Sequence, residues 1–462
     1  MNTYTICLIG FLYYLLIFFI SKFAGRKSED NEYLKTTAPA WLVTIGIVGD
    51  SLSGVTYLSV PGTVEQKSFS YLAICLGYLV GYVIIAYVFL PIYHKKNLVS
   101  IYEWIGSELG EMAQKTSSLL FVFGRLFGSA ARLCLTAGVL HLFVFKAMNL
   151  GNSFSIIAVT IGISLYTLKS GIKSLIVTDT VQSIFLVLGV LVTTVGLYYF
   201  LQSQNTSPQF FRPIVVGNDG EAWMTFWKSF FSGILITLSM TGLDQNIMQK
   251  TFSVKSLKSL QINFVRLGFI VLLVNFIVLL EGSLLTQSLD FFPHLKTQPN
   301  DQKLIYFVLN HQHFIFQLFF LLGLTAATLN SADSVITTVT SSIKVDLVKS
   351  NAVKLSHIHW IVTALLAGTA LFLNAFSEGS AIDLVLKSAG WTYGPLLGYF
   401  LIAALKLKSN SYSLILALIT SVIVTFLIHL NYDLKAEVII VLSMFILLFN
   451  RLYLFCHCLL RS

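Results

Sequence analysis

The chain has 462 residues, of which 56% are hydrophobic and 11% charged, and its formal net charge is +9. Soluble domains carry about a quarter of charged residues, so this composition excludes an ordinary soluble domain and predicts an integral membrane protein. The basic residues occur in small groups between apolar stretches, and no basic run is interleaved with aromatic residues, which argues against nucleic acid as a partner.

Apolar stretches long enough for a bilayer helix, which needs about 20 residues, recur along the whole chain. We predict an all-α protein with a single membrane domain of thirteen transmembrane helices in contact with the lipid bilayer, at residues 4–21, 40–61, 70–92, 117–145, 152–168, 175–201, 225–247, 260–283, 312–343, 356–375, 381–405, 411–430 and 436–456. Lysine and arginine concentrate on alternate connecting segments. This asymmetry predicts a multi-pass protein of the plasma membrane (the inner membrane in a bacterium), with its N-terminus outside and its C-terminus in the cytoplasm.

The second predicted span has polar and small residues at its centre, where a membrane helix is normally most apolar. Gly46, Gly49, Asp50, Ser51 and Gly54 lie close together there. This composition predicts a broken helix whose exposed backbone groups line a cavity or bind an ion. A packing interface of small residues is the alternative, but it does not account for Asp50.

The ninth predicted span has a second polar run, from Thr325 to Thr338. Ala327, Asn330, Ser331 and Ser334 follow helical spacing and therefore share one face. Their carbonyl, amide and hydroxyl groups are oxygen ligands of the kind that hard cations prefer, and sodium is similarly hard. The alternative is that these hydroxyls bond back to the preceding turn of their own helix.

Other charged residues also fall within or near apolar spans, where insertion costs roughly 2.5–3.5 kcal/mol each. They predict a hydrated internal pathway, although Asp383 and Lys387 are spaced to pair with each other. No nucleotide-binding, metalloprotease or serine-hydrolase motif occurs, which argues against an ATP-driven pump and against an enzyme. The remaining embedded charges are Asp179, Asp333, Arg125 and Arg132.

Five segments, in this order, resemble the sodium/solute symporter family: GDSLSGVTYLSVPG at 49–62, LVSIYEWI at 98–105, SGIKSLIVTDTVQ at 170–182, GLDQNIMQK at 242–250 and 329–347, which begins LNSADS. The resemblance covers about 22–405 and implies a LeuT-like fold. The two inverted repeats would span 40–201 and 225–405, with an extra N-terminal helix at 4–21 and two C-terminal helices at 411–456. The second and seventh spans would be the discontinuous helices that bind substrate.

The resemblance also implies sodium sites. The common site would use backbone carbonyls and a serine hydroxyl, with an asparagine where the family usually has serine or threonine. Its residues here would be Gly49, Leu52, Ala327, Asn330 and Ser331. A possible second sodium would be held by Asp179, Asp333 and Ser334, although Asp179 could instead cap a helix.

By the same resemblance, the chain would be a sodium-coupled symporter that imports a small polar organic solute, namely a sugar, an acidic sugar such as sialic acid, or a carboxylate. A proton-coupled or passive carrier, a channel and a transporter-like sensor remain as alternatives. Lys387 would suit an anionic solute, and Arg125 and Arg132 lie seven residues apart on one face of the fourth span. The predicted substrate contacts are Thr56, Tyr57, Arg132, Lys387 and Trp391.

Overall fold

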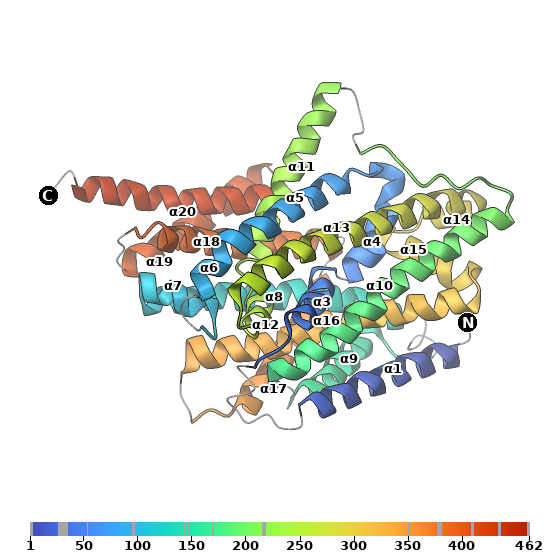
Figure 1. Cartoon of the computed structure of the whole chain (residues 1–462), viewed down its shortest axis with the longest axis horizontal. Coiled ribbons are helices and arrows are strands. Elements are labelled where there is room, and N and C mark those ends of the chain that lie inside the picture. Colours follow the sequence, from blue (N-terminus) through green and yellow to red (C-terminus); the bar gives the residue numbers. More distant parts are fainter. Residues whose placement is uncertain are drawn as a thin grey trace.

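The computed structural model describes residues 3–25, 36–52, 54–94, 98–141, 145, 148–168, 171–214, 219–349, 352–376, 381–407, 411–432 and 436–459. These residues form helices and connecting turns, and the described part of the chain contains no strand. The elements (Figure 1) are α1 Thr3–Ala24, α3 Ala40–Ser51, α4 Gly54–Lys67, α5 Tyr71–Ile84, η1 Ile85–Phe89, α6 Leu90–His94, α7 Ile101–Leu109, α8 Glu111–Leu140, α9 Asn152–Thr167, α10 Gly171–Ser203, α11 Asp219–Met240, α12 Gln245–Thr251, α13 Leu257–Ser288, η4 Leu289–Phe291, α14 Pro293–Lys296, α15 Asn300–His311, α16 Phe314–Ser342, η5 Ile343–Val348, α17 Leu355–Phe376, α18 Ala381–Ala404, α19 Ser411–Tyr432 and α20 Ala436–Leu459.

The all-helical class is confirmed, and each of the thirteen predicted spans overlaps one helix or consecutive helices. Among the described residues, seven helices are long and apolar enough to cross a membrane, and one bent pair would make eight. Three shorter apolar helices accompany them. The number that cross the bilayer, and the limits of the two repeats, therefore stay predictions.

Both predicted discontinuous helices are broken. Helix α3 ends at Ser51, Leu52 is extended with φ −104° and ψ 102°, and α4 leaves at an angle of 51°. Helix α11 ends at Met240, and after four intervening residues α12 begins at Gln245 with the Asp244 carboxylate as its N-cap. Helices α3 and α12 lie near the middle of the molecule (Figure 1) and contact each other. The two breaks therefore meet inside the helical bundle.

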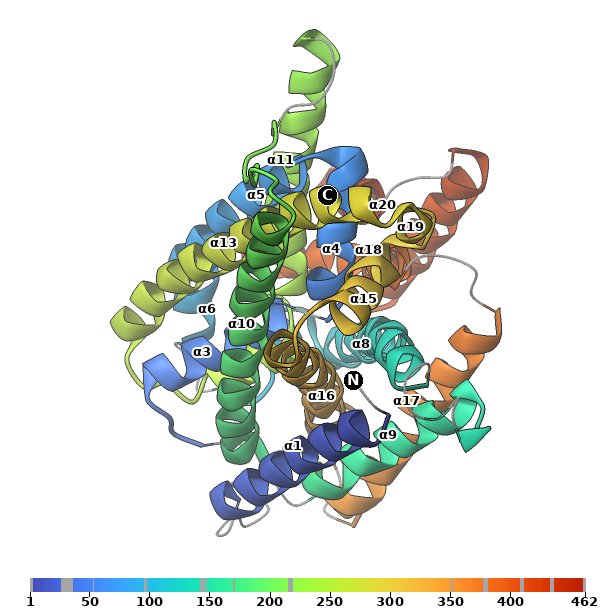
Figure 2. The same ribbon diagram turned by 90° about the vertical axis from the view of Figure 1, so that its right-hand side faces the viewer.

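Glycines allow two pairs of long helices to pack backbone to backbone. A Cβ atom added to Gly77 of α5 would lie 2.9 Å from the Cα atom of Gly233 in α11. One added to Gly189 of α10 would lie 3.0 Å from the Cα atom of Gly323 in α16. Figure 2 shows α10 running beside α16. Small residues at such crossings are typical of membrane helices, which associate by close packing.

A buried polar network joins two of the segments that carried the family resemblance. The Ser100 side chain caps α7, and its hydroxyl donates to the Asp346 carboxylate at 2.8 Å. Gln114 of α8 donates to the other oxygen of the same carboxylate at 2.7 Å. Glu103 accepts from the Ser100 backbone N–H at 3.1 Å and completes a capping box. The start of α7 is thereby anchored to η5, which continues α16.

Candidate ion and substrate site

The end of α3 lies directly against α10 and α16. The Gly49 N–H donates to the Ser183 hydroxyl of α10 at 2.9 Å. A Cβ atom added to Gly49 would collide with that hydroxyl and with the amide nitrogen of Asn330 on α16. Gly49 and Asn330, both predicted from the sequence as sodium ligands, are therefore in direct contact, and only glycine fits at this position.

Asn330 is an unusual residue in this setting, because neither its amide nitrogen nor its amide oxygen has a hydrogen-bond partner among the described residues. Its side chain is 1% exposed. A buried polar group without a partner is costly. The neighbouring end of α3 presents backbone carbonyls without intrahelical partners, at the negative end of the helix dipole. The amide oxygen and these carbonyls form surroundings that favour a small cation.

The other predicted ligands lie on the same stretch of α16 or at the break. The Ser331 hydroxyl donates to the Ala327 carbonyl at 3.1 Å, so the back-bonded arrangement is present. A hydroxyl in this position still has an oxygen lone pair available to a cation. Leu52 follows α3 as its C-cap in extended conformation, which leaves its carbonyl outside the α3 hydrogen-bond pattern.

Beside this region, a lysine from the second broken helix is completely buried. The Lys250 ammonium of α12 forms ion pairs with Asp50 of α3 and Asp179 of α10, both at 2.5 Å. It also donates to the Ser334 hydroxyl of α16 at 3.2 Å. Asn246 donates to Asp50 at 2.9 Å. A single cation therefore joins α12 to three other helices.

The three residues predicted for a second sodium have different surroundings. Asp179 is the ninth residue of α10 and fully buried, so the alternative that it caps a helix is wrong. Asp333 points to neutral donors, since it accepts from the Tyr166 hydroxyl at 2.7 Å and from the Gln182 amide at 3.2 Å. Ser334 instead contacts Lys250 and Asp50. Asp179 and Ser334 thus share the Lys250 ammonium, whereas Asp333 belongs to a separate set of hydrogen bonds.

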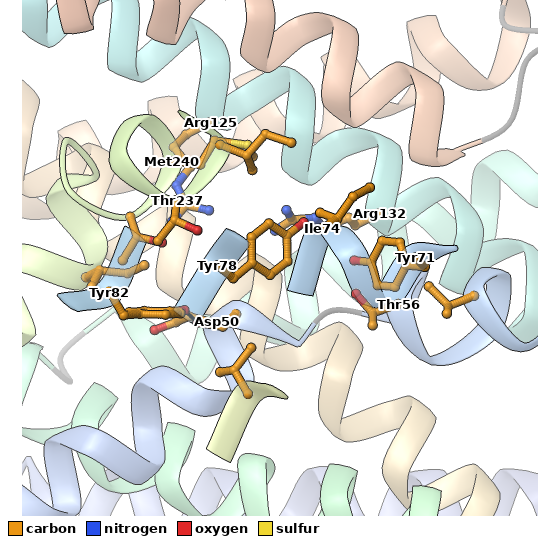
Figure 3. A pocket seen from close by; sticks show the side chains of 16 residues that line it. Asp50, Thr56, Tyr71, Ile74, Tyr78, Tyr82, Arg125, Arg132, Thr237 and Met240 are labelled. Carbon is orange, nitrogen blue, oxygen red and sulfur yellow. Dashed lines mark hydrogen bonds between the residues drawn. The ribbon is translucent and has the colours of Figure 1, made fainter. Parts of the chain in front are cut away.

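A cavity of about 160 Å³ lies next to the break between α3 and α4. Figure 3 shows Asp50 at one side of it, with the tyrosines of α5 and the two arginines of α8 around it. Of the predicted substrate contacts, Thr56 and Arg132 line this cavity. The lining residues are Asp50, Ser51, Thr56, Val60, Tyr71, Ile74, Tyr78, Tyr82, Arg125, Arg132, Ile236, Thr237, Met240, Thr241, Ile247 and Val271.

The two arginines of the cavity wall have different surroundings. Arg125 forms an ion pair with Asp244 at 2.5 Å, and the Asp244 carboxylate also accepts from the Tyr393 hydroxyl at 2.7 Å. Asp244 is fully buried and caps α12. Arg125 is therefore part of the structure that fixes the break before α12. Arg132, two turns along α8, adds a further positive charge to the cavity wall.

The remaining predicted substrate contacts lie outside the residues that line this cavity. Tyr57 is 1% exposed and packs against Phe320, with ring centroids 5.5 Å apart. Trp391 of α18 packs beside Phe426 and His429 of α19, at 5.8 and 5.7 Å. The side chains of Lys387 and Asp383 lie outside the part of the structure that is described. Roles for these residues in substrate binding stay predictions.

Residues 37–420 match the sequence profile of the "Sodium:solute symporter family". The chain belongs to this family. A rabbit (Oryctolagus cuniculus) sodium-dependent multivitamin transporter is 22% identical over 84% of the chain and 63% of its own length. A human sodium-coupled monocarboxylate transporter 2 is 24% identical over 57% of the chain and 45% of its own length. The chain thus spans less than two thirds of these relatives.

The structure of a Na⁺-coupled sialic acid symporter in a substrate-bound outward-open state superimposes on this family member with a TM-score of 0.80. It covers 96% of both chains at 16% identity. This similarity confirms the LeuT-like fold that the motifs implied. The family assignment and the broken helices together identify a multi-pass membrane protein.

Sequence reasoning did not assign roles to several residues of this site. Ser183 contacts Gly49, Lys250 binds two carboxylates, and Asp244 pairs with Arg125. One signal was available, because Asp50 lies in one of the two spans predicted to be broken, and Lys250, of opposite charge, lies three residues beyond the end of the other. Such embedded charges usually pair with each other. Ser183 gave no comparable signal, because it lies at an ordinary position of a long apolar helix.

Proposed function

We propose that this protein is a sodium-coupled symporter that imports a small monocarboxylate by alternating access. It would be a transporter and not an enzyme, in keeping with its family. One observation carries the proposal: Gly49, which contacts Asn330, is followed directly by Asp50 and Ser51, which line the cavity, so the end of α3 takes part in both. A cation bound at that segment would therefore affect the residues that contact the solute.

Charge favours an anionic solute. The cavity is lined by two guanidinium groups, those of Arg125 and Arg132, and by one carboxylate, that of Asp50, which pairs with Lys250. Arg132 adds a guanidinium, which binds carboxylates with two parallel hydrogen bonds. The human relative named above is a monocarboxylate transporter. These points favour a carboxylate over a neutral sugar.

The size of the cavity favours a small carboxylate. The cavity of about 160 Å³ is below the roughly 300–1,000 Å³ of pockets that hold drug-sized ligands. The tyrosines of α5 supply apolar ring surface with polar hydroxyls at the edge. A short carboxylate with a small apolar or hydroxylated tail matches this space better than an acidic sugar such as sialic acid.

Coupling follows from the position of the ion. Sodium held by the Asn330 amide oxygen, the Ser331 hydroxyl and the carbonyls of Gly49, Leu52 and Ala327 would fasten the end of α3 to α16. Asp50, Ser51 and Thr56 would then be fixed in the cavity wall. Sodium needs to favour this arrangement by only about 1–3 kcal/mol to raise solute affinity 5- to 150-fold.

In the cell, we place the protein in the plasma membrane, the inner membrane in a bacterium. The N-terminus would be outside and the C-terminus in the cytoplasm, as the distribution of lysine and arginine predicts. Transport would need no further protein partner. Cysteine-accessibility labelling of single residues in the two terminal segments tests the orientation.

Uptake of radiolabelled lactate into proteoliposomes tests the function. We expect uptake to be driven by an inward sodium gradient and lost when potassium replaces sodium. Ser331→Ala should weaken sodium activation, and Arg132→Gln should weaken lactate affinity at least tenfold. Arg266→Gln, which changes an exposed arginine of α13, should leave both unchanged.

Other outcomes favour other functions. Lactate flux that is equal in sodium and potassium would indicate a passive carrier or channel, and flux driven only by a pH gradient would indicate proton coupling. Uptake of glucose or sialic acid in place of lactate would refute the assignment of the solute. Solute binding without any flux would favour a sensor.

A further inference from the structure

The surroundings of Lys250 resemble an ion site that already holds its cation. An ammonium group has three N–H donors. Three oxygen atoms lie within reach of them: Asp50 Oδ2 and Asp179 Oδ2 at 2.5 Å and Ser334 Oγ at 3.2 Å. These oxygens come from α3, α10 and α16. Two carboxylates and a hydroxyl are also ligands that a hard metal cation would choose.

We propose that the Lys250 ammonium is a tethered cation that fills the place of a second sodium, so that the chain binds a single sodium ion. This inference rests on the proposed sodium coupling and specifies its stoichiometry. Asp179 and Ser334, two of the three residues predicted from the sequence for a second sodium, are the oxygens that hold the lysine. The third, Asp333, is occupied by Tyr166 and Gln182.

Electrostatics explains why a sodium ion and the ammonium exclude each other here. Both would need Asp179, and a sodium within reach of that carboxylate would lie a few ångströms from Nζ, where like charges in a water-poor interior repel strongly. The lysine also has an advantage over a free ion, because its covalent attachment to α12 gives the ammonium a high effective concentration at these three oxygens. Unlike sodium, the ammonium stays attached to the protein, so it cannot couple solute import to an ion gradient.

The tethered cation also connects the two broken helices. Lys250 belongs to α12, and Asp50 is the second-last residue of α3 and lines the cavity. Asn246 and Ser334 contact the other oxygen of Asp50. A mobile second sodium would make this connection depend on sodium concentration. A lysine makes it permanent, which leaves the site at Asn330 as the place where sodium acts.

Equilibrium binding of radiolabelled sodium to the purified full chain tests the proposal. We expect one sodium ion per chain for the wild type and two for Lys250→Ala, because this change removes the ammonium and leaves the three oxygen ligands in place. Lys258→Ala, at an exposed lysine of α13, is the matched control and should bind one. Two ions bound by the wild type would overturn the proposal, as would a single ion of unchanged affinity in folded Lys250→Ala.

If Lys250→Ala does not fold, a second variant tests whether Asp179 binds the lysine or a sodium ion. Asp179→Asn keeps the shape of the side chain, and we expect its sodium dissociation constant to stay within about twofold of the wild type, because Asp179 holds the lysine and not the ion. An increase of tenfold or more would make Asp179 a sodium ligand and overturn the proposal.

The two proposals fail in different ways. If the wild type binds no sodium and Lys250→Ala binds one, the tethered cation is supported and sodium coupling is refuted. If neither binds sodium, both proposals fall. Loss of lactate uptake alone, with one sodium still bound by the wild type, would count against the proposed solute and leave the Lys250 assignment intact.

Discussion

The backbone of Gly49 lies so close to Asn330 and Ser183 that a single methyl group there should disrupt the proposed sodium site. In Gly49→Ala, the new Cβ atom would occupy space taken by the Asn330 amide nitrogen and the Ser183 hydroxyl. The Gly49 N–H also donates to that hydroxyl at 2.9 Å, so Ser183 cannot move away without losing this hydrogen bond. Helix α3 must shift from α10 and α16, or both side chains must turn.

The expected size of the effect follows from overpacking. Forcing an extra carbon into a packed interior costs about 1–3 kcal/mol. If this cost falls on the sodium-bound state, sodium affinity drops roughly 5- to 150-fold. The double variant Gly49→Ala with Asn330→Ser should recover part of the loss. The Asn330 Cγ atom lies 3.4 Å from the added carbon, so a serine oxygen near that position makes ordinary contact.

The melting temperature of detergent-purified protein in sodium chloride and in potassium chloride at equal ionic strength measures the effect. Sodium at about 100 times its dissociation constant should stabilise the wild type by about 2.7 kcal/mol, and Gly49→Ala should lose most of this sodium-specific rise. Gly138→Ala is the control, because a Cβ atom there meets nothing within 4 Å. Wild-type sodium dependence in Gly49→Ala would refute the proposed contact between α3 and α16.

Three further predictions concern polar groups away from this contact. Arg125→Met should destabilise the protein by about 3–5 kcal/mol, measured as reduced yield and melting temperature, because it leaves buried Asp244 without its cation; Arg125→Met combined with Asp244→Asn should recover part of this loss. Ser100→Ala should cost about 0.5–2 kcal/mol through loss of the α7 cap, and an unchanged melting temperature would contradict the cap. Glu281→Gln should leave stability equal or higher, because this fully buried carboxylate has only the Thr193 hydroxyl as a hydrogen-bond partner among the described residues; lower stability would indicate a partner for its charge.

The fold could be predicted from the sequence because membrane helices have strong local signals. Each apolar stretch became a helix, and the glycine-rich centre of 40–61 became the break at Leu52. The break before α12 was harder to predict, since only Gly242 and the acidic cap Asp244 mark it in the sequence. It followed from the family resemblance and not from composition.

The site was predicted less completely, because its contacts join residues far apart in the chain. Helical spacing placed Asn330 and Ser331 on one face, but it could not bring Ser183 to Gly49 across more than 130 residues. The seven-residue spacing of Arg125 and Arg132 placed them on one helix face, and both side chains line the cavity. It did not show that Asp244 would neutralise the first of them.

The two glycine crossings, α5 with α11 and α10 with α16, also have a practical consequence. Two helix backbones in direct contact cannot move closer together, and moving them apart would break the close packing between the two helices. Each pair should therefore travel as a rigid body during the transport cycle. The distance between two spectroscopic labels, one on each helix of a pair, should therefore stay constant and can serve as an internal reference. The distance between a label on one pair and a label on the other would then report how the two pairs move relative to each other during transport.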